Sequence, residues 1–154
     1  MTIDSSHSKV TFHLKKMGFL AVSGTLTDFS GKIIFDPKTL DNAEFDVCVK
    51  SATITTGNPK RDEHLKNPDF FDVEKFPTIC FKSSSVKAEK GQFETEGELT
   101  ILEATQSVRI PFKQEGNTLT GHFSVDRTQF GLGTKFPGFI VGKTVNITIT
   151  CQFQ

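Results

Sequence analysis

The stretch from Lys143 to Phe153, KTVNITITCQF, alternates apolar and polar residues without interruption. One side carries Val145, Ile147, Ile149, Cys151 and Phe153, and the other carries Thr144, Asn146, Thr148, Thr150 and Gln152. A strand with this period of two buries one face and exposes the other to water. The pattern therefore predicts a strand, and it leaves open whether the buried face belongs to a packed core or lines a cavity.

The same alternation returns in further segments along the chain. They are SKVTFHLK (8–15), LAVSGTLTD (20–28), GKIIFDP (31–37), EFDVCVKS (44–51), PTICFKS (77–83), QFETEGELTI (92–101), TQSVRIPFK (105–113) and TLTGHFSVDR (118–127). Turn signals such as Lys90-Gly91 separate them. Short strands at this spacing indicate an all-β sandwich or barrel. With no linker or repeat, we expect residues 1–154 to form a single domain.

One segment, between Gly57 and Asp72, does not alternate. Asn58 followed by Pro59 is typical of a helix N-cap with proline at the first helical position. Pro68 forbids continuation, so the helix should end near Lys66. The sequence thus predicts one short helix, at about residues 59–66, inserted in a β chain.

Three glycines favour a barrel over a sandwich. Gly24, Gly97 and Gly121 all lie on the inward side of their predicted strands, where a glycine weakens a strand. Either they let the strands of a barrel bend sharply, or their missing side chains leave an interior void. Both interpretations imply a strongly curled sheet.

Composition narrows the possible partners. The formal net charge is zero and the longest basic runs are pairs, which argues against nucleic-acid binding. The chain has 16 phenylalanines but no tryptophan or tyrosine, a balance that suits an apolar interior. Three cysteines, an odd number, argue against a disulfide framework, and Cys151 has the position of a core residue.

The sequence also bears on location and chemistry. It has no apolar stretch long enough to be a transmembrane segment and no visible signal peptide, so we expect a cytoplasmic protein, or a periplasmic one if a leader was removed. No HExxH, CxxC, GxSxG, Walker or GxGxxG motif is present. We therefore expect a protein that is not an enzyme, with no catalytic residues, no metal and no cofactor.

Four motifs resemble the YceI-like family of polyisoprenoid-binding proteins. They are HSKVTFHLKKMGFLAVSGTLTDFSGKIIFDP (7–37), TITTGNPKRDEHLKNPDFFDVEKFPTICFKS (53–83), GELTILEATQSV (97–108) and DRTQFGLG (126–133). The resemblance implies a lipocalin-like, eight-stranded antiparallel β-barrel. Its cavity would take the apolar tail of an isoprenoid quinone, a prenyl phosphate or a similar amphiphile. Lys16 stands where many relatives have a histidine, and many relatives are periplasmic.

The inward residues are the candidate wall of such a cavity, although periodicity alone fits a packed core as well. They are Phe12, Leu14, Val22, Leu26, Phe35, Val47, Val49, Phe81, Leu99, Ile110, Phe123, Val125, Arg127, Ile147 and Ile149. Arg127 would contact a phosphate or a quinone carbonyl, or else pair with Asp69 or Asp72.

The candidate mouth or gate consists of Arg61, His64, Phe70 and Phe71. These residues either cap one barrel end or contact a head group. The leading hypothesis is a carrier that holds a long isoprenoid or similar lipid, a hydrophobic small-molecule ligand, without making or breaking bonds. The alternative is a filled barrel that acts as a stress-related protein-interaction module. A homodimer is possible in either case.

Overall fold

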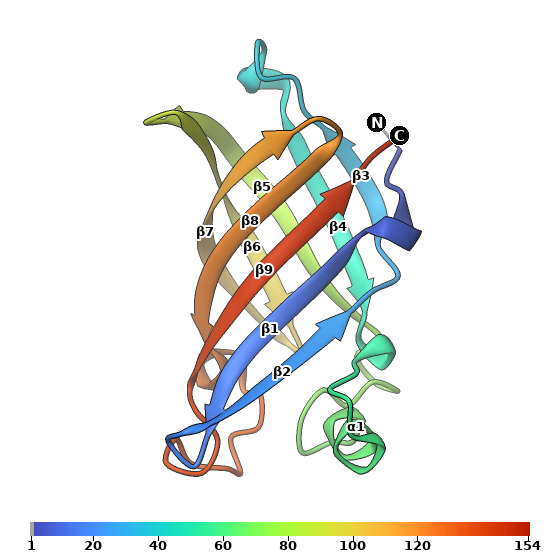
Figure 1. Cartoon of the computed structure of the whole chain (residues 1–154), viewed down its shortest axis with the longest axis vertical. Helices are drawn as coiled ribbons and strands as arrows, with labels where there is room; N and C mark the ends of the chain where they lie inside the picture. The colour runs from blue at the N-terminus through green and yellow to red at the C-terminus, as the bar shows by residue number, and fades with distance from the viewer. Residues whose placement is uncertain (1) are drawn as a thin grey trace.

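A computed structural model describes residues 2–154, and its strands form one antiparallel sheet that curls on itself (Figure 1). The strands are β1 (Lys9–Lys16), β2 (Leu20–Leu26), β3 (Ser30–Ile34), β4 (Glu44–Lys50), β5 (Thr78–Glu89), β6 (Gln92–Ile101), β7 (Ala104–Glu115), β8 (Thr118–Asp126) and β9 (Thr144–Gln152). The order across the sheet is β2-β1-β9-β8-β7-β6-β5-β4-β3. The predicted all-β barrel is confirmed.

The sheet closes because one stretch of chain joins its two edges. β2 and β3 stand at opposite ends of the strand order, yet only residues 27–29 separate them in sequence. Thr25 also exchanges backbone hydrogen bonds of 2.9 and 3.1 Å with Thr55, just beyond β4. The resemblance implied eight strands and the structure has nine, because β2 and β3 are the two parts of one bent stretch.

The short helix is confirmed, with the predicted bounds. Helix α1 spans Pro59–Lys66, and the side chain of its N-cap Asn58 accepts a hydrogen bond from the N–H of Arg61 at 3.2 Å. Residues 2–154 also contain four 3-10 turns: η1 (Ser5–His7), η2 (Leu40–Asn42), η3 (Ser51–Thr53) and η4 (Arg127–Phe130). No helix within residues 2–154 is long and apolar enough to cross a bilayer.

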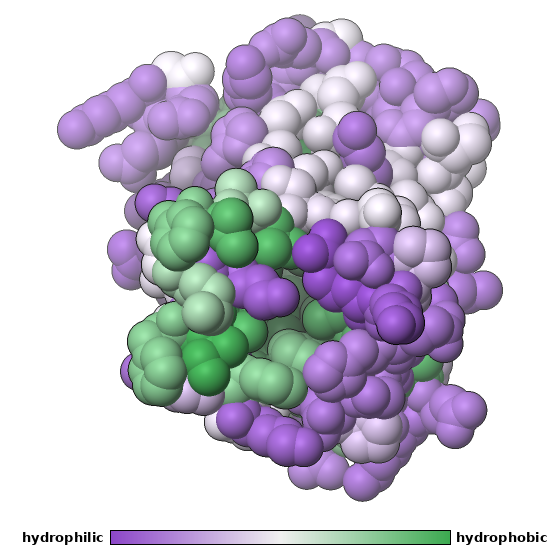
Figure 2. Space-filling view, turned by 60° about the horizontal axis from the view of Figure 1, so that its bottom comes forward, coloured by the Kyte–Doolittle hydropathy of each residue, from purple (hydrophilic) through white to green (hydrophobic). Residues whose placement is uncertain are grey.

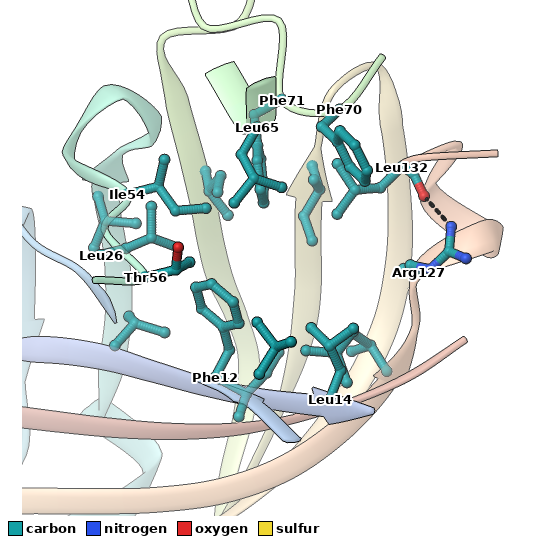
Figure 3. Close-up of a pocket in the computed structure, with 18 of the residues that line it drawn as sticks. Phe12, Leu14, Leu26, Ile54, Thr56, Leu65, Phe70, Phe71, Arg127 and Leu132 are labelled. Atoms are coloured by element: carbon teal, nitrogen blue, oxygen red, sulfur yellow. Dashed lines mark hydrogen bonds between the residues drawn. The ribbon is translucent and has the colours of Figure 1, made fainter. Parts of the chain in front are cut away.

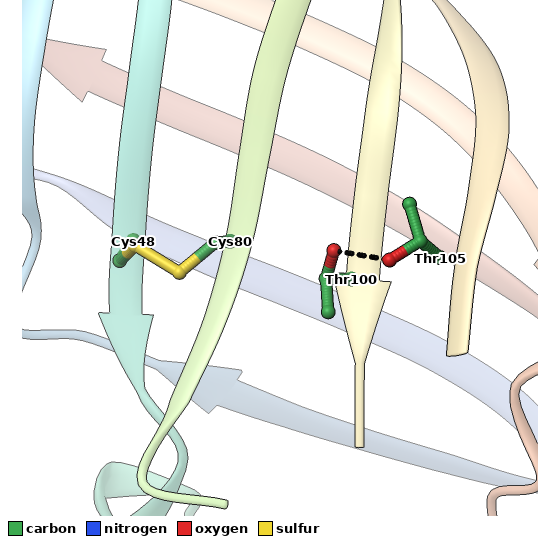
Figure 4. Close-up of a disulfide and its surroundings, with 4 residues drawn as sticks. All are labelled: Cys48, Cys80, Thr100 and Thr105. Carbon is green, nitrogen blue, oxygen red and sulfur yellow. Dashed lines mark hydrogen bonds between the residues drawn. A yellow bond between two sulfur atoms is a disulfide. The ribbon is translucent and has the colours of Figure 1, made fainter. Parts of the chain in front are cut away.

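The expectation of no disulfide is wrong. Cys48 of β4 and Cys80 of β5 are directly opposite in the strand register, with Cα atoms 4.1 Å apart, and their sulfur atoms are bonded (Figure 4). An odd cysteine count only requires that one cysteine stays free. That one is Cys151, which is buried as predicted, and burial raises the pKa of its thiol.

Neighbouring atoms occupy the space beside Gly24 and Gly97. A Cβ added at Gly24 would lie 2.4 Å from the ring of Phe12, and one at Gly97 would lie 2.3 Å from the carbonyl oxygen of Lys82. At Gly24 and Gly97 the missing side chains therefore give room to neighbouring groups and leave no void, whereas Gly121 lines a small void. Next to Gly97, the β5–β6 register shifts between Ser83 and Ser85, where the wall bends.

Phenylalanines close the barrel end that lies away from α1. The rings of Phe35, Phe45, Phe93 and Phe112 have centroids 5.1 to 6.1 Å apart, most of them in edge-to-face contact. A small void of about 70 Å³ lies between this cluster and the rest of the interior. The far end is thus ordinary core.

Candidate functional site

A cavity of about 510 Å³ occupies the end of the barrel that α1 covers. Its wall is almost entirely apolar and its volume falls in the range typical of ligand pockets. Figure 3 shows Phe12 and Leu14 across the space from Leu65, Phe70 and Phe71. Figure 2 views this end of the molecule and shows it hollowed between hydrophobic atoms on one side and hydrophilic atoms on the other.

Nearly all of the predicted wall residues line this cavity. They are Phe12, Leu14, Val22, Leu26, Val47, Val49, Phe81, Leu99, Phe123, Val125, Arg127, Ile147 and Ile149. Two do not: Phe35 belongs to the aromatic cluster and Ile110 lines the smaller void. Both point inward as predicted, but alternation says nothing about how deep along the barrel a residue lies.

Sequence reasoning missed a second group of wall residues. They are Val10, Lys16, Phe29, Ile54, Thr56, Leu65, Ile79, Cys80, Ile101, Leu132, Phe136, Ile140, Val141 and Val145. Val10, Ile79, Ile101 and Val145 lie at inward-facing positions in the alternating pattern of their strands. Most of the others come from α1 and from loops, which have no period to follow.

The mouth is built from α1 with its following turn and from the loop after η4. The ring of Phe70 stacks on Phe136 with centroids 5.2 Å apart, and His64 meets both rings edge-on at 5.3 and 5.7 Å. All four predicted mouth residues, Arg61, His64, Phe70 and Phe71, line the cavity. The structure thus brings them together where the barrel opens.

Ionisable side chains hold the lid, which we define as residues 51–77, the stretch between β4 and β5 that contains α1. Nε2 of His64 lies 3.0 Å from the carboxylate of Asp69, and Lys135 lies 3.7 Å from the same carboxylate. The hydrogen bond with His64 is the main cause that lowers the pKa of Asp69; the positive charge of Lys135 adds to it, and partial desolvation opposes it. Asp69 therefore contacts α1 through His64 and the loop after η4 through Lys135.

Arg127 is a structural residue. The residue is 3% exposed, and its guanidinium donates to five backbone carbonyls, those of Gly142, Leu132, Gly133, Phe136 and Val141, at 2.6 to 2.9 Å. A guanidinium has five N–H donors, so none remains for a head group. Figure 3 shows one of these bonds, to Leu132. Neither predicted role, head-group contact or pairing with Asp69 or Asp72, matches this arrangement.

Arg61 is the contrasting case. Its Nε donates to Oγ1 of Thr56 at 2.8 Å and its Nη2 to the Thr56 carbonyl at 2.9 Å. Asp62 holds Thr56 in turn, by accepting from its N–H at 2.8 Å. Within residues 2–154 Nη1 of Arg61 has no hydrogen-bond acceptor, so this cavity-lining arginine keeps donors for a ligand.

The described residues 2–154 contain no group of three or more histidine, cysteine, aspartate or glutamate side chains placed to hold a metal ion. The cavity wall has few polar residues, and those at the mouth are Lys16, Thr56, Arg61 and His64. Arg127 also lines the wall, but its N–H groups donate to backbone carbonyls. What this arrangement can do is desolvate an apolar chain and contact one polar head.

The chain is similar to known proteins over most of its length. It is 32% identical over 113 residues to Protein YceI of Salmonella arizonae and of Salmonella paratyphi B, a match that covers 73% of this chain and 59% of those relatives. Burkholderia cenocepacia BcnA has a similar structure, with 26% identity, a TM-score of 0.89 and 99% of each chain covered.

A polyisoprenoid-binding domain of Saccharophagus degradans, implicated in plant cell wall breakdown, shares the fold at 10% identity, with a TM-score of 0.72 and coverage of 97% and 95% of the two chains. The model of the YceI-like domain matches residues 1–153. The resemblance found in the sequence is therefore confirmed, and the chain belongs to the YceI-like family.

Proposed function

We propose that this protein is a non-enzymatic carrier that holds a long isoprenoid or similar amphiphilic lipid, with its apolar tail in the cavity and its polar head at the mouth. The observation that carries the proposal is the open apolar cavity of about 510 Å³. Affinity comes from removing the tail from water, and ordering the flexible chain offsets part of that gain. A filled barrel would have a solid interior, which disfavours the alternative of an interaction module.

Arg61 supplies the head-group contact in this proposal. A guanidinium with free N–H groups suits a phosphate or a carbonyl, which favours prenyl phosphates and prenyl quinones among the candidate ligands. The disulfide between Cys48 and Cys80 supports an oxidising compartment such as the periplasm over the cytoplasm, because thiols are kept reduced in the cytosol.

Uptake of a prenyl ligand tests the tail site. Folded protein should take up farnesyl phosphate at one molecule per chain, measured by native mass spectrometry. Ile147→Trp, which fills the cavity, should abolish uptake. Asn146→Trp, on the exposed outer face of the same strand, should not. Equal uptake by both variants would count against the cavity as the binding site.

A second comparison tests the head-group contact. Arg61→Gln should weaken binding of farnesyl phosphate by about tenfold or more while leaving farnesol unchanged, since hydrogen bonds to charged groups contribute about 1.5 to 3 kcal/mol. Lys60→Gln, on the same helix but outside the cavity wall, is the matched control. Equal losses for the phosphate and the alcohol would mean that Arg61 only supports the lid through Thr56.

A further inference from the structure

Exposed apolar side chains gather at the rim of the cavity. Five large apolar residues are strongly exposed within residues 2–154. Met17, Phe19 and Leu20, at 52, 76 and 50%, follow β1, and Phe139, at 76%, lies in the loop after η4. Only Ile34, at 39%, lies elsewhere, at the opposite barrel end. Isolated exposed apolar residues are ordinary, but a cluster indicates an interaction surface.

Backbone hydrogen bonds join the two segments that carry this apolar rim, which we define as Met17, Phe19, Leu20 and Phe139. The N–H of Met17 donates to the carbonyl of Ile140 at 2.8 Å, and the N–H of Gly142 donates to that of Lys15 at 2.7 Å. Ile140 itself lines the cavity. The rim is therefore continuous with the cavity wall, and Figure 2 shows hydrophobic atoms gathered along one side of the hollow.

Charge decides what kind of partner fits the rim. The segments 15–27 and 127–143 contain no aspartate or glutamate, but they carry the exposed Lys15, Lys16 and Lys143. A fourth lysine, Lys135, lies 3.7 Å from the carboxylate of Asp69 and is already paired. Apolar tips flanked by lysines are the features of proteins that insert into the interface of an anionic bilayer. A second copy of this chain docked through the same segments would bring lysine against lysine.

We propose that the apolar rim, with Lys15, Lys16 and Lys143, docks the protein on an anionic lipid surface with the cavity mouth facing the bilayer. The apolar tips enter the boundary between head groups and acyl chains, and the ammonium groups contact lipid phosphates. Docking needs no ligand in the cavity. Where the carrier function proposed above also holds, a tail passes from bilayer to barrel without crossing water.

Co-sedimentation of the full chain with vesicles tests the proposal. The protein should bind vesicles of phosphatidylcholine mixed with phosphatidylglycerol, should bind pure phosphatidylcholine more weakly, and should release as salt rises. The double variant Phe19→Ser, Phe139→Ser should bind the mixed vesicles at least about tenfold more weakly, given the transfer energy of a phenyl side chain. Ile34→Ser, which is exposed and apolar at the other end, should bind like the wild type.

The lysines are tested in the same way. Lys15→Gln with Lys143→Gln should lower partitioning by about 25-fold, because each basic residue near an anionic surface contributes about fivefold. Lys9→Gln with Lys38→Gln, exposed and outside the rim segments, is the matched control. If both double variants lost the same amount of vesicle binding, the protein would be attracted to the anionic vesicles by its overall charge and not through the rim segments.

Three results would overturn docking: no vesicle binding, equal binding by the rim variant and the wild type, or a dimer in sedimentation velocity that only the rim variant loses. The last result would assign the surface to a second copy. Ile147→Trp, which blocks the cavity, should still bind vesicles. Vesicle binding without ligand uptake would sink the carrier function alone, and uptake without vesicle binding would sink docking alone.

Discussion

Two arginines line the cavity, and their neighbours give them opposite roles. Arg127 is buried and donates every N–H to a backbone carbonyl, whereas Arg61 is half-buried and keeps donors free. Burial lowers the pKa of Arg127, and the neighbouring charge of Asp126 opposes that shift. The side chain type alone could not distinguish the two roles; the hydrogen-bond partners do.

Removing the donors of Arg127 should destabilise the fold. Arg127→Met keeps the length of the side chain but leaves buried carbonyls without partners, so the free energy of unfolding should fall by about 3 kcal/mol or more. Arg109→Met, at an exposed position 3.7 Å from Glu96, should change it by less than about 1 kcal/mol. Denaturant unfolding measures both; a stable Arg127→Met protein would contradict the structural role.

Gly97 is tested by adding one methyl group. In Gly97→Ala the new Cβ would meet the carbonyl oxygen of Lys82, a backbone atom that cannot rotate away, so we expect a loss of about 1 to 3 kcal/mol in unfolding free energy. Gly138→Ala meets only the flexible side chain of Lys143 and should be near neutral. If both substitutions are neutral, the β5–β6 contact is looser than the structure shows.

At the scale of elements, β4 and β5 hold the segment that carries α1. The chain leaves the barrel after Lys50, forms the lid, and returns at Thr78. The disulfide between Cys48 and Cys80 joins the two ends of this excursion inside the sheet, while the Asp69–His64 pair and the stacked ring of Phe70 hold its tip. The lid is thus held to the barrel at its two ends by the disulfide and at its tip by side-chain contacts.

The disulfide should stabilise the protein because it closes a loop and so restricts the unfolded chain. With a sequence separation of 32 residues, its loss in Cys48→Ser, Cys80→Ser should lower the free energy of unfolding by about 3 to 4 kcal/mol. Reduction of the wild type should give the same loss in chemical unfolding. The same midpoint with and without reductant would show that the thiols are not bonded in solution.

The lid should loosen in acid. The pKa of Asp69 is lowered in the folded protein, so its contribution is present above the ordinary aspartate value of 3.8 and is lost as the pH falls below it. Amide hydrogen exchange of α1 should therefore rise below about pH 4 relative to that of β6. Asp69→Asn should remove the pH dependence; an unchanged profile in this variant would assign it to another carboxyl.

At the scale of the whole molecule, the phenyl cluster at the closed end sets the depth of the cavity and hence the tail that fits. An engineered cavity of about 150 Å³ binds benzene, which has six carbons. At the same filling, about 510 Å³ holds about 20 carbon atoms, or four isoprene units. A longer tail would leave the mouth and gain little more.

Affinity should therefore rise with tail length and then level off. From geraniol through farnesol to geranylgeraniol, each isoprene unit should tighten binding by about tenfold, at about 0.3 kcal/mol per heavy atom. Solanesol should bind no more than a few-fold tighter than geranylgeraniol. Displacement of an apolar fluorescent probe measures the series, and a further large gain at solanesol would mean that the cavity extends past the phenyl cluster.

The sequence by itself determined which segments form strands, where the helix lies, and which side chains of the alternating segments point inward. These follow from local rules, because alternation with period two separates the faces of a strand and Asn58-Pro59 starts a helix wherever it is packed. Nearly all predicted wall residues line the cavity for the same reason, and family membership was visible in the motifs.

Only the tertiary structure decided how far apart, how deep and how well paired those side chains are. Phe35 and Ile110 point inward but lie beyond the cavity. Cys48 lies opposite Cys80 because of the strand register, and the N–H groups of Arg127 all donate to backbone carbonyls. Each of these features depends on contacts between segments that are distant in the chain. The alternation of residues along one strand contains no information about such contacts.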